Sequence, residues 1–543
     1  MTRPELWLGA TLAVPFAMVA LCLARSLRDR MPGLLMLAPL PALAASLSVA
    51  DTSQMVLPGA LLGLTFLLDE PGAMLLGSAA LLWSVSGAYA HPFLSGRAHR
   101  GRFATWWLMT LAGNLGVFMS ADLVSFYVLF TLATLAAYGL IVHDGTSASR
   151  RAGAVYIALA VLGEALLLMA FVLLAAGSAE GSLAIRDAVA ALPTSPWRDS
   201  ARALLVLGFG LKIGLVPLHV WMPLTYSAAP IPAAAVLSGA AVNAGVIGLI
   251  RFLPFDAGLP DWGGALAAAG LISAFAGAGL GITQTNPRTV LAYSSVSQMG
   301  LIAAVLGMGL TIGSASAPKA AAFYAVHHAL AKGGLFLAVG VAALTNKGRL
   351  WPVLLPAAVI ALALAGLPLT GGALAKSAIK APLGEGLAGT LATLSAITST
   401  LLMLHFVHCL TRSGHTPTTR APPGLVICWL AIAFASIAVP WALYPAALGA
   451  PLRDALALGT LWEALWPLLV GGALALALGT RPHRLPHVPA GDVLAVVERA
   501  APALRNLAAA SERIEGWLRQ WPVAGVLLLV LTIALAATLL VGR

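Results

Sequence analysis

The stretch AFYAVHHALAKGG, residues Ala322 to Gly334, places two histidines and a lysine inside a long run of small and apolar residues. An ionisable side chain at the centre of a membrane span costs at least about 2.5 to 3.5 kcal/mol on insertion scales, so spans that keep one usually use it. Whether this stretch is a membrane span therefore decides both the fold class and the meaning of His327, His328 and Lys332.

The amino-acid composition indicates that the chain is a membrane protein. The 543 residues are 60% hydrophobic and 9% charged, whereas a soluble domain carries about 25% charged residues. Windows of about 20 apolar residues, the length of a membrane-crossing helix, recur along the chain. The sequence predicts an all-α polytopic membrane protein with about 14–16 transmembrane helices, and it leaves no room for a soluble catalytic domain.

The basic residues indicate topology and not a nucleic-acid partner. The formal net charge is +11, but the lysines and arginines are scattered over many short loops. They are concentrated in alternate loops, which by the positive-inside rule places the N-terminus outside. We expect an integral protein of the bacterial plasma (inner) membrane whose contacts include the lipid bilayer and no nucleic acid.

Cofactor and metal signals are absent from the sequence. Cys22, Cys409 and Cys428 show no CxxC spacing, so neither a disulfide framework nor a metal site is predicted. The chain has no GxGxxG or GKS/T phosphate loop. We therefore predict no cofactor and no metal, and we do not expect the chain to catalyse a reaction by itself.

Two lysines stand beside helix breakers. Lys212 lies in GFGLKIGLVPLHVWMP, five residues before Pro217, and Lys376 lies in GLPLTGGALAK, after Pro368 and two glycines. A proline frees backbone carbonyls in a membrane helix. Two interrupted, lysine-bearing helices in corresponding halves predict an internal repeat and an ion pathway.

The opening stretch separates into two faces. Tyr324, His328 and Lys332 are spaced four residues apart and share one helix face. His and a desolvated Lys can both change charge during a transport cycle. His327 is rotated by about 100° from that face. For His327, packing with one satisfied hydrogen bond and a functional role both remain open.

The remaining polar residues within spans carry weaker signals. Glu164 is a carboxylate inside a span, with Lys212 as its natural partner in a functional or a purely structural pair. Ser294 and Ser297 lie in SSVSQ, where they could bond to helix carbonyls or hold a chain of waters. Lys380 and Glu463 lie near span ends and are expected to reach the interface.

Four motifs resemble the antiporter-like (proton-translocating) membrane subunits of respiratory complex I, membrane-bound hydrogenases and Mrp cation/proton antiporters. The motifs are KIGLVPLHVWMPLTYSAAPIPAAAVLSG, NPRTVLAYSSVSQMGLI, HALAKGGLFLAVG and GLPLTGGALAKS. They occur in family order over roughly residues 55 to 410, and they look closest to the hydrogenase and Mrp-D-like branches. The resemblance implies two inverted five-helix repeats, each with a discontinuous helix, and a hydrated axis of charged residues between half-channels.

The resemblance assigns residues to that axis. Lys212 matches the lysine of the first broken helix, His328 and Lys332 match the central pair, and Lys376 matches the lysine of the second broken helix. The family pairs its first lysine with a glutamate in a Trp-Glu pair, which here aligns with Phe130-Thr131. Glu164 aligns with a second acidic position and could take over the partner role. A further His or Lys of the family is replaced at the candidate positions Leu237 and Asn243.

The domain organisation follows from the spans and the repeats. Residues 1-102 form N-terminal helices with an outer re-entrant or hairpin segment, and 103-250 and 264-410 form the two repeats. Residues 411-480 add further spans. Residues 481-522 form an amphipathic helix on the inner surface, with a solvated linker as the alternative, and 523-543 form a last span.

Two functions are compatible with this sequence. The first is a proton- or Na+-translocating subunit of a multi-subunit energy-converting complex of the NADH dehydrogenase, hydrogenase or Mrp type, in which any oxidoreductase activity belongs to the complex. The second is a coupling or scaffold subunit, for example of an inorganic-carbon uptake complex, with weakened ion conduction. The loss of the glutamate at Thr131 keeps the second function open. Both imply other membrane subunits as partners.

Overall fold

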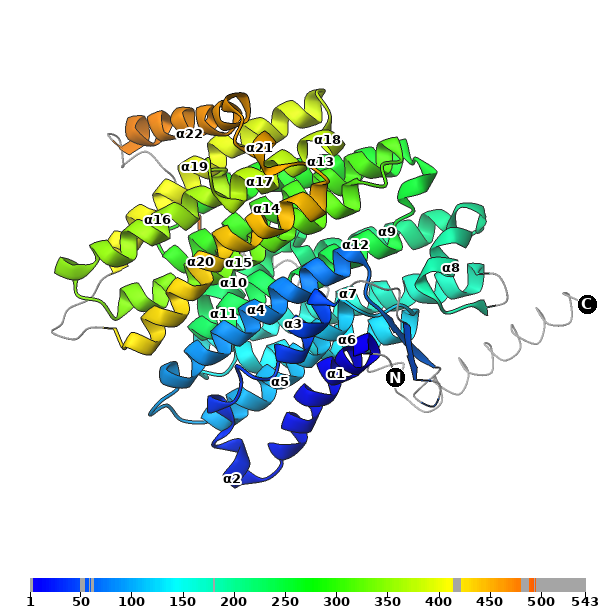
Figure 1. Cartoon of the computed structure of the whole chain (residues 1–543), viewed down its shortest axis with the longest axis horizontal. Coiled ribbons are helices and arrows are strands. Elements are labelled where there is room, and N and C mark those ends of the chain that lie inside the picture. The colour runs from blue at the N-terminus through cyan, green and yellow to red at the C-terminus, as the bar shows by residue number, and fades with distance from the viewer. Residues whose placement is uncertain are drawn as a thin grey trace, which may run out of the picture. The chain divides into compact units, whose positions relative to one another are not determined.

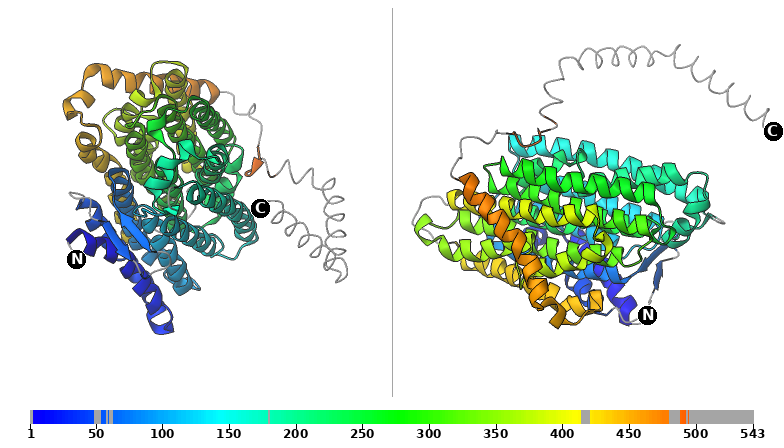
Figure 2. Two further views of the ribbon diagram at one scale, coloured as in Figure 1. Left: turned by 90° about the vertical axis from the view of Figure 1, so that its right-hand side faces the viewer. Right: turned by 90° about the horizontal axis from the view of Figure 1, so that it is seen from above.

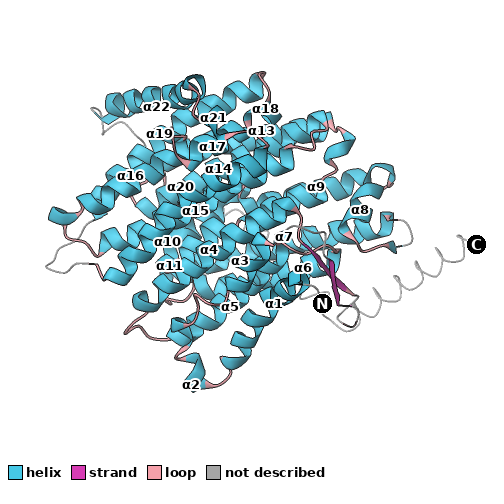
Figure 3. Cartoon of the chain, viewed as in Figure 1, coloured by secondary structure: helices cyan, strands magenta, loops and turns pink. Residues whose placement is uncertain are grey.

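The computed structural model describes residues 3–48, 54–57, 59, 63–178, 181–413, 421–479, 488–492 and 494. Within these residues eleven helices are long and apolar enough to cross a membrane, or twelve if one bent pair is counted as a span. Figure 3 shows helices almost throughout, with one short pair of strands. The all-α polytopic class is therefore confirmed.

The helix count is lower than the 14–16 that the sequence predicts, for identifiable reasons. The predicted span at 31–50 is divided between a short 3-10 turn and an eight-residue helix. The apolar helix Trp351–Ala365 is too short to span by itself. The predicted last span lies outside the described residues, as does most of the predicted surface helix.

The N-terminal elements lead into a β-hairpin and a long helix (Figure 1). The elements are α1 (Arg3–Leu21), α2 (Arg25–Arg28), η1 (Met31–Gly33), α3 (Leu40–Leu47), β1 (Gln54–Leu57), β2 (Leu64–Leu67) and α4 (Glu70–Phe93). The chain bends by 119° between α1 and the segment that begins at Arg25. The strands are antiparallel, with Gln54 opposite Leu67 and Leu57 opposite Leu64. The outer segment is thus a hairpin.

The first predicted repeat contains five helical segments, of which the last four are long and apolar enough to cross a membrane. Its elements are α5 (Arg100–Val117), α6 (Leu123–Ile141), α7 (Ser147–Gly177), α8 (Ile185–Ala191), η3 (Leu192–Thr194), α9 (Arg198–Ile213), η4 (Leu218–Val220), α10 (Trp221–Ala228), α11 (Ile231–Val236), η5 (Leu237–Ala241) and α12 (Asn243–Phe252). The fourth segment is broken between α9 and α10, where Gly214 adopts a left-handed φ of 71°. The fifth contains η5, a turn of π-helix.

The second predicted repeat has the same number of segments and is also broken in its fourth. Its elements, with the preceding turn, are η6 (Phe255–Ala257), α13 (Pro260–Ile282), α14 (Pro287–Ile312), α15 (Ala317–Ala343), η7 (Lys347–Arg349), α16 (Trp351–Ala365), α17 (Gly371–Ala378), α18 (Lys380–Leu383) and α19 (Leu387–Ser413). Gly366 and Leu369 have φ of 106° and 63° between α16 and α17. Both predicted discontinuous helices are present.

Three further helices follow the second repeat. They are α20 (Pro423–Leu448), α21 (Leu452–Ala455) and α22 (Leu458–Gly479). Helix α20 packs against α15 and α4, whereas α22 lies against α19 at the edge of the bundle (Figure 2). Only 17% of the apolar window that contains α22 is buried.

The core is centred on α15, the helix that carries AFYAVHHALAKGG. Its whole apolar window is buried, as is that of the α11–α12 segment, and α4, α11, α14, α16 and α20 surround it. Helices α13 and α14 approach each other closely because small residues face across them. A Cβ on Gly300 would lie 2.5 Å from the carbonyl oxygen of Gly270.

Candidate functional site

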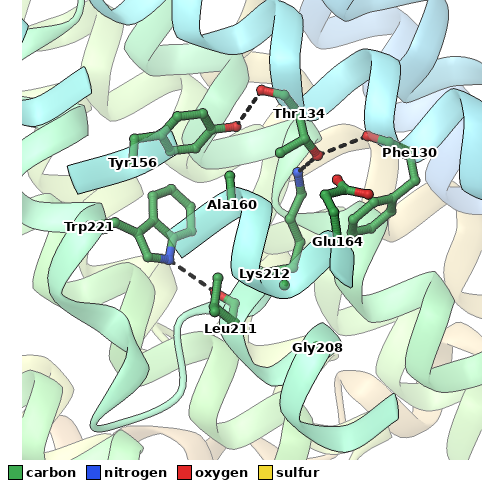
Figure 4. A pocket seen from close by; sticks show the side chains of 10 residues that line it. Phe130, Thr134, Tyr156, Ala160, Glu164, Gly208, Leu211, Lys212 and Trp221 are labelled. Atoms are coloured by element: carbon green, nitrogen blue, oxygen red, sulfur yellow. Dashed lines mark hydrogen bonds between the residues drawn. The ribbon is translucent and has the colours of Figure 1, made fainter. Parts of the chain in front are cut away.

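Lys212, at the end of the first broken helix α9, lies in a cluster with side chains of α6 and α7. Lys212 is in the last turn of α9, and its Nζ donates a hydrogen bond of 2.7 Å to the Thr134 hydroxyl of α6. The same ammonium lies 4.7 Å from the centre of the Phe130 ring. Figure 4 shows the lysine pointing between the two α6 side chains. The break after Ile213 therefore ends the helix where the charge meets a hydroxyl and an aromatic face.

Glu164 of α7 is held by Thr131, the residue at the position of the missing glutamate. The Thr131 hydroxyl donates a 2.5 Å hydrogen bond to Glu164 Oε2. The carboxylate is buried, with 6% of the residue exposed. Thr131 and Thr134 are one helical turn apart, so neighbouring hydroxyls of α6 hold the carboxylate and the ammonium.

The direct Glu164–Lys212 pair that the sequence predicts is not formed. Among the described residues no ion pair joins these two side chains, but both line one cavity of about 20 Å³. A site needs roughly 10–15 Å³ to accept a water molecule, so this cavity has room for about one. The separation arises because each charge already has a threonine of α6 within reach. The cluster is therefore arranged for a contact through one water.

The central residues lie on α15 and are directed toward α14. The Tyr324 hydroxyl donates a 2.5 Å hydrogen bond to the Gln298 side-chain oxygen, and Lys332 Nζ donates one of 2.9 Å to the Leu291 carbonyl. His328, on the same face, is fully buried. The Gln298 amide in turn donates to Ser399 of α19 at 3.3 Å. Tyr324 is thus part of a polar line that reaches a third helix, whereas the buried ring nitrogens of His328 have no hydrogen-bond partner among the described residues.

The predicted serines lie on α14 but do not join this line. Ser297 donates to the Ala274 carbonyl of α13 at 2.7 Å, and Ser294 contacts the Met403 sulfur at 4.0 Å. Ser297 therefore bonds to a helix carbonyl, the first of the two alternatives that the sequence left open, whereas Ser294 contacts a sulfur atom.

Asn243, one of the positions where the family often has His or Lys, contacts the central helix. Its side-chain amide donates to the Gly239 carbonyl at 3.1 Å and to the Ala325 carbonyl of α15 at 3.4 Å. Gly239 lies in the π-turn η5, and a Cβ there would lie 2.6 Å from the Ala329 carbonyl. A π-turn inserted in a helix often marks a functional position. Here it brings a neutral amide, and not a charge, against α15.

His327 lies beside the second break. A Cβ on Gly371 would lie 2.9 Å from its Nδ1, and a Cβ on Gly372 would lie 3.0 Å from its Nε2. The imidazole therefore packs against the glycine pair that opens α17, the helix of Lys376. The rotation of about 100° from the stripe turns His327 toward this second broken helix.

Lys376 lines a large cavity at the edge of the bundle. Its side chain lies over Gly366, where an added Cβ would be 2.9 Å from the lysine Cδ. The cavity has a volume of about 620 Å³ and is bordered by α17, α18, α19 and α22. Its polar lining residues are Lys376, Ser377, Lys380, Glu385, Thr390, Thr393, Thr460 and Glu463. The cavity is large enough for many waters.

Lys380 and Glu463 form an ion pair across this cavity. Their side chains are 53% and 58% exposed, as the expectation that they lie near span ends requires. No local pattern predicts this pair, because the two residues are 83 positions apart on α18 and α22 and meet only through tertiary packing. The pair places one charge of each sign in the same chamber as Lys376.

Comparison with known proteins identifies the family. The model described as NADH:quinone oxidoreductase/Mrp antiporter, TM matches residues 120–403, more than half of the chain. The chain belongs to this family. The match begins just before α6 and ends within α19. The matched region contains Glu164 and the candidate pathway lysines Lys212, Lys332 and Lys376, whereas α22 and Glu463 lie beyond it.

Relatives of this antiporter-like chain occur in different assemblies. It is 33% identical over 298 residues to NADH-quinone oxidoreductase subunit N of Desulforudis audaxviator, an alignment that covers 51% of this chain and 56% of the relative. It is 32% identical over 291 residues to hydrogenase-4 component B of Escherichia coli, covering 51% and 43%. The alignments thus span about half the length of these curated relatives.

A solved structure shares the antiporter-like fold. A chain of the Mrp complex from Dietzia sp. superposes with a TM-score of 0.75 at 22% identity, covering 99% of this chain and 63% of that one. The likeness extends over the described helices and shows the fold alone.

Proposed function

We propose that this chain is a proton-translocating, or Na+-translocating, subunit of a multi-subunit energy-converting membrane complex. Charge moves along Glu164, Lys212, His328, Lys332 and Lys376. The driving reaction takes place in partner subunits, because this chain contains no nucleotide loop and no cluster of cysteines. The membrane is the bacterial inner membrane, with the N-terminus outside and the predicted surface helix inside.

The observation that carries this proposal is the presence of lysines at three places inside one bundle, Lys332 buried and Lys212 and Lys376 half-buried. The Lys212 and Lys376 side chains border cavities at the two broken helices, and Lys332 is fully buried in the central helix. A lysine at the centre of a membrane span opposes insertion by at least about 2.5 kcal/mol. Three lysines that each raise the free energy of insertion favour a role in an ion pathway. Apolar side chains would fill the same space without this penalty.

The first step of the path is supported by the Thr131 contact. Thr131 cannot carry a charge, but its hydroxyl fixes the Glu164 carboxylate 33 positions along the chain. The adjoining cavity, which Glu164 and Lys212 both line, has room for about one water, and the proposed path runs through it. The first half of the pathway therefore keeps an acidic group and a lysine despite the loss of the usual glutamate.

The exit of the path is supported by the 620 Å³ cavity at Lys376. His327 links the central helix to the break that carries this lysine, through its contact with Gly371 and Gly372. By the predicted topology the cavity opens to the outer side. Lys380 and Glu463 hold opposite charges in this chamber, and a charge pair of this kind tunes which ions enter it.

The proposal is tested by Lys376→Ala in the purified complex, reconstituted in vesicles. Proton uptake coupled to the driving reaction is expected to be lost while the complex stays assembled. Lys347→Ala, which changes a lysine of the short turn η7, is the matched control and should pump normally. Normal pumping by Lys376→Ala would contradict the proposal, and the proteins that co-purify identify the driving reaction.

The alternative is a coupling or scaffold subunit with weak conduction, and Thr131 is the observation that favours it. Under this alternative Lys376→Ala leaves the activity of the complex nearly unchanged. Changes in residues 490 to 520 instead release the partner. The two functions therefore predict opposite outcomes for the same pair of variants.

A further inference from the structure

A second group of charged residues lies away from the pathway, where the loops at the ends of α1 and α4 meet the start of α5. They border one cavity of about 350 Å³. Its lining residues are Arg28, Asp29, Arg97, His99, Arg100, Gly101 and Arg102. Four guanidinium groups face one carboxylate, so with a neutral His99 the lining carries a net charge of 4 − 1 = +3.

The backbone around this cavity is fixed by close contacts. Gly96 and His99 adopt left-handed φ of 74° and 60°, which turns the loop between α4 and α5 sharply. A Cβ on Gly101 would lie 2.8 Å from Cγ of Arg28, so the two chain segments touch. Arg97 is stacked 4.0 Å over the ring of Phe93. The arginines thus project from a backbone whose conformation is fixed by these contacts.

The positive charge of the cavity is not balanced within the described residues. No ion pair is recorded there for Arg28, Arg97, Arg100 or Arg102, whereas Arg251 is paired with Asp69 at 2.7 Å. Like charges held together repel one another. This backbone therefore concentrates four cations around a single carboxylate, Asp29.

Two of these arginines oppose the stability of their own helix. Arg100 and Arg102 lie in the first turn of α5, which contains no acidic residue. The positive end of the helix dipole disfavours cations there by about 0.3–1 kcal/mol each. Neither arginine is placed to serve helix stability. The positive-inside rule accounts for basic residues in this loop, but not for their gathering around one cavity.

The pKa of the neighbouring His143 is lowered by burial and, in part, by the same arginines. His143 follows the end of α6, outside the membrane-spanning segment, and its ring contacts Phe103 of α5. Burial is the main cause that lowers its pKa, and Asp144 opposes the shift. Arg97 and Arg102 lower the pKa further. The field of the cluster thus reaches a side chain outside the cavity.

Exposed apolar side chains lie next to Arg28 in the sequence. Leu23 is 84% exposed in the turn between α1 and α2, and Leu27, beside Arg28, is also exposed. A soluble anion would contact only the arginines. An amphiphile would contact the arginines with its charged group and the exposed leucines with its apolar part. Arginine suits a phosphate group because its fork of N–H donors matches two phosphate oxygens.

We propose that this cavity binds the phosphate group of an anionic phospholipid whose acyl chains lie along the exposed leucines. By the predicted topology these loops face the cytoplasm, where basic pockets between membrane helices meet anionic head groups. The lipid supplies the counter-charge that the chain lacks, and it joins α1, α4 and α5 at this end of the bundle.

The test uses the full-length chain, purified, delipidated in detergent and titrated with phosphatidylglycerol or phosphatidylcholine under native mass spectrometry. We expect wild type to retain phosphatidylglycerol in preference to phosphatidylcholine. The Arg100→Gln/Arg102→Gln variant should bind phosphatidylglycerol at least about tenfold more weakly, a loss of about 1.4 kcal/mol. Because this variant relieves unfavourable charges at a helix start, it should fold normally.

The control is Arg150→Gln/Arg349→Gln, which removes two exposed arginines on the same predicted side but outside the cavity. It should retain phosphatidylglycerol as the wild type does. Equal retention by the cavity variant would overturn the proposal. Displacement of the lipid by about 10 mM inorganic phosphate would assign the site to a soluble phosphate and overturn the lipid assignment, since multivalent lipid contacts resist such competition.

Discussion

The Thr131 hydroxyl donates a 2.5 Å hydrogen bond to the carboxylate of Glu164. The family position that usually holds the acidic group is thus in direct contact with the residue that we propose has replaced it. The Lys212 ammonium is bound one turn away, by Thr134 of the same helix. In the proposed pathway the acid is on α7 instead of α6, and Thr131 of α6 orients it.

Glu164→Gln is expected to lower coupled ion flux at least about tenfold, which corresponds to about 1.4 kcal/mol in the barrier. A glutamine still accepts the Thr131 hydrogen bond but cannot carry the charge. The measurement is proton uptake by vesicles that contain the assembled complex. Asp187→Asn, a neutralised carboxylate in α8 outside the pathway, is the matched control.

Returning the acid to α6 should restore part of this loss. Thr131→Glu in the Glu164→Gln background places a carboxylate one turn from the threonine that binds Lys212. We expect flux to rise above that of Glu164→Gln alone. Wild-type flux in the single Glu164→Gln variant would show that Glu164 has not taken over the partner role.

The second break depends on the absence of a side chain at Gly372. An added Cβ would lie 1.6 Å from the Ala363 carbonyl oxygen, so α17 must move for Gly372→Ala to fit. Overpacking of this kind costs about 1–3 kcal/mol. A lower midpoint of thermal unfolding in detergent is expected. Gly264→Ala in α13 is the control, because nothing lies within 4 Å of its added Cβ, and an equal effect of both would refute the steric account.

Access of water to Lys376 can be measured by labelling. In a chain whose native cysteines are replaced by alanine, Ser377→Cys places a thiol on the 620 Å³ cavity. A charged thiol reagent added from the outer side should modify it. Ser294→Cys, fully buried between α14 and α19, is the control and should stay unmodified. Equal rates at both positions would exclude an outward-opening chamber.

Much of the fold could be predicted from the sequence because its signals are local. A run of apolar residues fixes each span, and Gly and Pro next to Lys212 and Lys376 mark the two breaks. The spacing of Tyr324, His328 and Lys332 fixes a shared helix face by geometry alone. Segment 31–50 was predicted as one span because composition does not show where a short apolar run will bend.

The contacts between distant segments could not be predicted in this way. Arg251 pairs with Asp69 from 182 positions away, and Lys380 meets Glu463 only because α22 packs on α19. His327 packs against the glycine pair Gly371 and Gly372. The residue spacing on α15 does not predict this contact. Such pairs depend on tertiary packing. Local patterns in a single sequence, without aligned relatives, do not predict them.

The most direct test of the proposed pathway is Lys332→Met in the assembled complex. Methionine has a similar length and no charge, so packing around this fully buried position is kept. Proton uptake in vesicles is measured together with the turnover of the driving reaction. We predict that uptake is lost while the complex remains intact, because the central lysine joins the two halves. Wild-type uptake with wild-type turnover would contradict the account.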